Sequence, residues 1–195
     1  MRPIRRSAGL SAYLATGPAV DHHHPLVRET AARPARDATD PYDYARAAYE
    51  FVRDAVPHSQ GSGDLRVTWR ASDVPTLRTG VYHAESHALA ALLRAEDIPA
   101  ALCCQRLTDD AGGHLVRGLV AVRCHGAWHR QEPGGTKPGV DARFSLDGER
   151  PAWVPDPAAG ELDPPESYAA PHPAVLDAPR TGRRCGRTLT TALPG

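Results

Sequence analysis

The stretch RTGVYHAESHALAALLRAEDIPA, residues 78–100, places chemically versatile side chains directly after a glycine turn. Tyr82 and His83 fall in the first turn of the helix predicted here, where neither a serine nor a cysteine is present. A tyrosine and a histidine can exchange protons, and the main-chain N–H groups at a helix start favour an anion or a developing oxyanion. A phenol with a pKa of about 10 is a poor nucleophile at pH 7. The pattern therefore indicates proton transfer or anion binding rather than nucleophilic attack.

A metal site is the alternative interpretation of the same helix. His83 and His87 are four residues apart, so both could reach one ion from a single helix face. The sequence HAESH differs from the zinc-binding HExxH pattern, because its glutamate does not follow the first histidine. The chain's four cysteines include no CxxC pair, and they are interpreted as small buried side chains. We therefore expect neither a metal nor another cofactor.

Helices predicted in the first half of the chain would position this site. A short helix is expected from about Pro25, and DPYDYARAAYEFVRDAV predicts an amphipathic helix with Asp40 as its N-cap. Residues 58–80 are interpreted as a loop with a short strand at Leu65–Trp69. The central helix, residues 82–95, is apolar on nearly every face, which is typical of a buried helix.

Three strands are predicted after the central helix. They are IPAALCCQRLT, LVRGLVAVRC and AWHRQEP, with the turn HGA between the last two. A helix followed by antiparallel strands predicts an α+β fold. We expect one domain over residues 1–195, with an irregular segment at 1–24 and a proline-rich C-terminal extension with short helices at 145–195.

Charge and hydropathy exclude several classes of partner. The 23 basic and 23 acidic residues give a net charge of zero, so a general nucleic-acid binder is not expected. We expect no membrane partner, because no apolar run approaches the roughly 20 residues of a spanning helix. The N-terminal stretch lacks the apolar core of a signal peptide, and a cytoplasmic location is therefore expected.

The stretch DVPTLRTGVYHAESHALAALLRAEDIPAALCCQRL, together with the later KPGVDARF, resembles the bacterial transglutaminase-like family of the papain-like superfamily. The resemblance implies a papain-like fold with a central buried helix packed on an antiparallel β-sheet. It also implies a Cys-His-Asp triad, whose cysteine begins the central helix. In such a triad a thiolate attacks an amide carbonyl and forms a thioester.

All three triad positions differ in this sequence. The cysteine position falls on Tyr82, the histidine position on Arg117 and the aspartate position on Glu132. Only the glutamate preserves the chemistry, because an arginine does not deprotonate in proteins and cannot act as a base. His114 would reach the site instead if a bulge shifted its strand. Thiol-dependent acyl transfer at this position is therefore not expected.

The resemblance suggests roles for these residues. Tyr82 would be the general acid or base with His83 as its partner, Arg117 would anchor an anionic group, and Glu132 would orient the reacting groups. The candidates for contacts with a substrate are His114, Lys137 and Trp128. The same replacements also fit an ordinary ion pair in a cleft that has lost its activity.

Three functions are compatible with this pattern. The favoured one is a repurposed enzyme that performs acid–base chemistry, such as condensation, cyclisation or dehydration, on a small carbonyl-bearing metabolite in specialised biosynthesis. The alternative is a catalytically dead pseudoenzyme that binds a ligand or regulates a protein partner. The third is a residual cysteine-independent peptidase or amidase.

Overall fold

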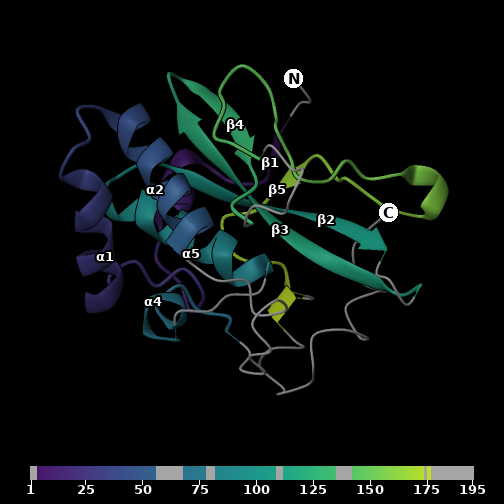
Figure 1. Cartoon of the computed structure of the whole chain (residues 1–195), viewed down its shortest axis with the longest axis horizontal. Coiled ribbons are helices and arrows are strands. Elements are labelled where there is room, and N and C mark those ends of the chain that lie inside the picture. The colour runs from purple at the N-terminus through teal and green to yellow at the C-terminus, as the bar shows by residue number, and fades with distance from the viewer. Residues whose placement is uncertain are drawn as a thin grey trace.

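The computed structural model describes residues 4–55, 68–77, 82–108, 112–134, 142–173 and 175–176 (Figure 1). In chain order its elements are β1 (Arg5–Arg6), η1 (Leu10–Leu14), α1 (Pro25–Ala35), α2 (Pro41–Ala55), α4 (Asp73–Leu77), α5 (Tyr82–Ala95), β2 (Ala100–Thr108), β3 (His114–Cys124), β4 (Ala127–Gln131), η2 (Pro157–Ala159) and β5 (Glu166–Ser167).

The main sheet consists of β2, β3 and β4, all antiparallel, with β3 in the middle. The register of β2 and β3 runs without interruption from Ala100 opposite Val122 to Thr108 opposite His114. The turn between β3 and β4 uses His125 and Gly126, whose φ angles are 49° and 81°. Two successive residues with positive φ are typical of a type I′ hairpin turn. The three predicted strands and the HGA turn are therefore confirmed.

The helices gather on one side of this sheet (Figure 1). Helix α5 contacts β2 and β3, and it also contacts α1 and α2. Every side chain from His83 to Arg94 is consequently buried. This confirms the prediction from apolar residues on nearly every face of the helix. The fold is the expected α+β arrangement of a central helix packed on an antiparallel sheet.

The start of α2 follows the predicted capping pattern. The Asp40 carboxylate accepts a hydrogen bond of 2.8 Å from the Asp43 N–H group, and Pro41 is the first helical residue. Helix α1 likewise begins at Pro25, as predicted. None of the described helices has the length and apolar character needed to cross a bilayer.

Two segments differ from the sequence-based expectation. Residues 1–24 are not irregular throughout, because β1 pairs in parallel with β5 and η1 follows it. Within 68–77 the chain forms α4, which was predicted as loop. Both elements span five residues or fewer, too short for a periodic pattern to reveal them. The predicted strand at Leu65–Trp69 lies largely outside the described residues, and Trp69 is not in a strand.

The C-terminal segment, residues 142–173, pairs with the sheet edge formed by β2. Leu102 on β2 forms a bridge with Tyr168, and Arg106 forms one with Leu162. Short helices were expected in the C-terminal extension, and η2 is a short 3-10 helix within it, whereas residues 177–195 lie outside the described residues. This pairing makes the C-terminal segment a part of the folded domain.

Candidate functional site

The N-terminal end of α5 lies directly on β3. The helix begins at Tyr82, as predicted, but the side chain of Tyr82 lies outside the described part of the structure. A Cβ atom added to Gly118 would lie 3.0 Å from the His83 Cα and 3.1 Å from the Ser86 Cβ. Only glycine leaves room for the helix at this point, so Gly118 sets how closely α5 approaches the strand.

Arg117, the residue before Gly118, forms an ion pair with Glu132 just after β4. The surroundings of Gly134, two residues after Glu132, show that a second carboxylate lies close to this ion pair. A Cβ atom added to Gly134 would lie 3.1 Å from Arg117 Nη2, 3.5 Å from Glu85 Oε2 and 3.6 Å from Glu132 Oε1. Glu85 comes from the first turns of α5. We call Glu85, Arg117 and Glu132 the charged cluster.

The charged cluster is almost completely enclosed. Glu85 has no exposed surface, and Glu132 and Arg117 are 3% and 5% exposed. Burying two carboxylates with one guanidinium favours a proton on one of the acids, because a second anion would be left uncompensated. Burial raises the pKa of Glu85 to about 8, although Arg117 opposes that rise. Burial thus favours the protonated form of Glu85 beside the Arg117–Glu132 pair.

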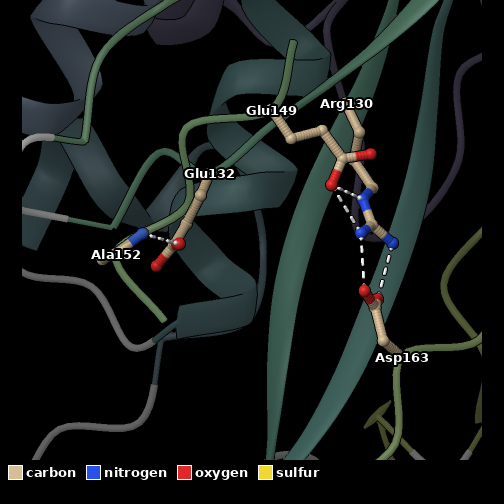
Figure 2. A network of polar contacts seen from close by, with 5 residues as sticks. All are labelled: Arg130, Glu132, Glu149, Ala152 and Asp163. Carbon is tan, nitrogen blue, oxygen red and sulfur yellow. Dashed lines mark hydrogen bonds and ion pairs between the residues drawn. The ribbon is translucent and has the colours of Figure 1, made fainter. Parts of the chain in front are cut away.

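The two oxygens of Glu132 have different partners. One contacts Arg117, and the other accepts a hydrogen bond of 2.6 Å from the Ala152 N–H group (Figure 2). Burial raises the pKa of Glu132, while Arg117 and the Ala152 N–H group oppose that rise by stabilising the anion. Glu132 therefore fastens the C-terminal segment to the charged cluster.

Arg130 on β4 holds the same segment a few residues away (Figure 2). Its Nη1 and Nη2 donate to Asp163 at 2.7 and 2.8 Å, and its Nε and Nη2 donate to Glu149 at 3.1 and 2.7 Å. The contact with Asp163 is bidentate, and such a contact fixes both partners in position. Residues 149–163 are thus fixed at both ends to a single strand.

His83 and His87 are buried neutral side chains. Burial lowers the pKa of His83 to about 3 and that of His87 to about 4. His87 Nδ1 lies 2.7 Å from the Trp69 carbonyl oxygen, whereas His83 Nε2 has no hydrogen-bond partner within the described residues. The rings are 6.1 Å apart, and no cluster of three potential metal ligands occurs in the described part of the chain.

The space beside these histidines is small. A cavity of about 20 Å³ is lined by residues that include His83, Ser86 and Gly118, and it has room for a single water molecule. A substrate would need a considerably larger space.

Two of the three candidate substrate contacts lie away from the charged cluster. His114 starts β3 in an unbroken register, so the bulge that would bring it closer is absent and it lies about 10 Å along the strand from Arg117. Its ring packs near Gly160. Trp128 packs on Tyr13 with ring centroids 5.1 Å apart, in a cluster on the sheet face opposite α5. Lys137 lies outside the described residues.

Glu85 is the residue that the sequence interpretation missed. Its position three residues after Tyr82 places it one helical turn further along the same face. An acidic residue in a first helical turn ordinarily favours the helix dipole at the surface, so its type alone gives no warning of burial. The signal that could have identified Glu85 is its position in a helix that is apolar on nearly every face. A charged side chain buried in such a helix is expected to lie beside an opposite charge.

Comparison with known proteins identifies the family. The family model described as the transglutaminase-like superfamily matches residues 28–132, just over half of the chain. The chain belongs to the transglutaminase-like superfamily. The match contains α5 and all three strands of the main sheet, and it ends at Glu132.

One solved structure supports the fold, and a second shows a weaker likeness. A protein of Cytophaga hutchinsonii described as a cysteine protease shares 18% identity at a TM-score of 0.51, covering 64% of this chain and 41% of its own. A transglutaminase (TGase) structure shares 17% identity at a TM-score of 0.41, covering 66% of this chain and 34% of its own. The transglutaminase-like chain thus spans well under half the length of these proteins. No curated protein matches the sequence.

Proposed function

We propose that this transglutaminase-like protein does not perform thiol catalysis and acts as a binding or regulatory protein. The observation that carries the proposal is the buried ion pair between Arg117 and Glu132. By the family resemblance, these residues occupy the histidine and aspartate positions of the triad. A guanidinium in that place cannot accept the proton of a nucleophile.

Burial of the charged cluster supports the same conclusion. Transglutaminase-type chemistry requires a substrate carbonyl to reach the start of the central helix. Among the described residues, the Glu132 carboxylate already contacts Arg117 and accepts a hydrogen bond from the Ala152 N–H group. The geometry therefore favours a binding protein over the repurposed enzyme that the sequence alone favoured.

The proposal is tested by restoring the triad. The native protein and the triple variant Tyr82→Cys, Arg117→His, Glu132→Asp are incubated with a glutamine-containing peptide and hydroxylamine. We expect no hydroxamate from the native protein and a slow, iodoacetamide-sensitive reaction from the triple variant. Turnover by the native protein that iodoacetamide abolishes would contradict the proposal.

An acid–base enzyme remains the second candidate, because one observation favours it. Glu85 is a buried carboxyl whose pKa is raised to about 8, and proton donors in enzymes are tuned in this way. In this alternative Glu85 would supply the proton to a small carbonyl-bearing metabolite, with Tyr82 and His83 as further proton-transfer groups. Turnover of such a compound that resists iodoacetamide and disappears in Glu85→Gln would favour this enzyme.

A further inference from the structure

A second cavity lies on the side of α5 that faces the other helices, away from the sheet. It has a volume of about 250 Å³ and is enclosed by α1, α2, α5 and the segment that contains α4. The cavity is partly open to solvent, where the side chain of its lining residue Arg33 is 58% exposed. Its volume approaches the lower limit of small-molecule sites.

The walls of the cavity are mainly apolar. Val27, Val52, Val74 and Leu92 supply branched aliphatic side chains from four different parts of the chain. Ala88 on α5 is part of the lining, and its single methyl group leaves the space open where a leucine would fill it. An apolar body of matching size would regain the dispersion contacts that an open space lacks.

The polar groups of the cavity are Thr30 and Arg33. The Thr30 hydroxyl already donates to the Leu26 carbonyl oxygen at 2.7 Å, so a ligand is not needed to satisfy it. Arg33 is 58% exposed and lies 3.8 Å from Glu29, an exposed i,i+4 pair that contributes little. Its guanidinium can therefore turn to an anionic group in the cavity.

We propose that this cavity binds a small amphiphilic carboxylate, with its apolar body among the aliphatic side chains and its carboxylate on Arg33. A medium-chain fatty acid has this chemistry. The cavity shares no lining residue with the charged cluster. The proposal therefore stands whether or not the protein has lost acyl transfer.

The test uses decanoate, and decanol as a probe without the charge, titrated into the full chain by calorimetry below their micellar range. Arg33→Gln removes the carboxylate partner. Arg36→Gln is the matched control, because Arg36 is the C-cap of α1, three residues after Arg33, and does not line the cavity. We expect Arg33→Gln to weaken decanoate binding about tenfold and to leave decanol unchanged. Arg36→Gln should change neither.

A filling variant provides the second arm. Ala88→Leu should weaken both probes by about tenfold or more, provided that circular dichroism shows the native fold. If that variant does not fold, the comparison of Arg33→Gln with Arg36→Gln decides. The proposal is overturned if the native chain binds no decanoate at millimolar concentration. It is also overturned if the two arginine variants behave alike, or if a folded Ala88→Leu binds as the native chain does.

Discussion

Arg117 on β3 and Glu132 after β4 form an ion pair whose side chains are only 7% and 1% exposed. Burying both charges costs desolvation free energy that offsets much of their attraction, so the surrounding fold is needed to keep the pair in place. The same carboxylate also accepts the Ala152 N–H group, which links the pair to the C-terminal segment. The pair thus joins β3, the end of β4 and the C-terminal segment.

Removing one partner of this pair should destabilise the protein strongly. Arg117→Ala leaves Glu132 as a buried charge without its cation, and we expect the free energy of unfolding to fall by about 3–5 kcal/mol. Urea denaturation measures this change. The double variant Arg117→Leu, Glu132→Leu should lose less than the two single changes together. A loss below 1 kcal/mol for Arg117→Ala would show that the pair is not buried in solution.

Glu85 should make stability fall as pH rises. The pKa of its carboxyl is raised from 4.5 to about 8, so the native state retains a proton that the unfolded chain releases. Its contribution is complete below pH 4.5 and is lost as pH approaches 8. Compared with Glu85→Gln, the native protein should therefore lose on the order of a few kcal/mol across this interval.

The comparison with Glu85→Gln also removes the effect of the histidines. Burial lowers the pKa values of His83 and His87, so these histidines make the free energy of unfolding rise with pH. The native protein and Glu85→Gln share this effect, so it cancels in their difference. Urea denaturation at several pH values provides the two curves. Parallel curves would mean that Glu85 titrates normally.

Gly118 should not tolerate a side chain. In Gly118→Ala the added methyl group would meet the Cα of His83 and the side chain of Ser86, so α5 must move away from β3. We expect a loss of about 1–3 kcal/mol in the free energy of unfolding. Gly17→Ala is the control, because a Cβ atom there has no neighbour within 4 Å. Equal stability of the two variants would refute the close contact.

Loss of the Arg130 side chain should loosen the C-terminal segment before it loosens the core of the fold. Arg130→Met leaves Glu149 and Asp163 without their guanidinium, and we expect a loss of about 3 kcal/mol. Amide hydrogen exchange should increase over residues 149–163 before it increases in α5. The control Arg5→Met breaks only an exposed contact with Glu166 and should change stability by less than about 1 kcal/mol.

The buried thiols should resist alkylation. Burial raises the pKa of Cys103 to about 12 and that of Cys104 to about 11, so very little thiolate forms at pH 8. Iodoacetamide should modify both slowly in the native protein and rapidly in urea, as followed by peptide mass spectrometry. Fast labelling of Cys103 in the native state would point to a reactive thiol.

The sequence determined the elements and the family. Periodicity, capping residues and turn residues are local properties, so the central helix, the three strands and the Asp40 cap could all be predicted. The motif around residues 78–107 indicated the family that the comparison then showed. The pairing of Arg117 with Glu132 was also anticipated, since both fall on neighbouring strands.

Only the tertiary structure decided what surrounds those side chains. That Glu85 lies close to Arg117 and Glu132, that the Ala152 N–H group binds the second oxygen of Glu132 and that Trp128 faces away from α5 all depend on contacts between distant segments. Apolar periodicity shows which face of an element is buried, but it does not show which distant segment packs against that face. These tertiary contacts decide whether a side chain is buried or exposed, and therefore what chemistry it can perform.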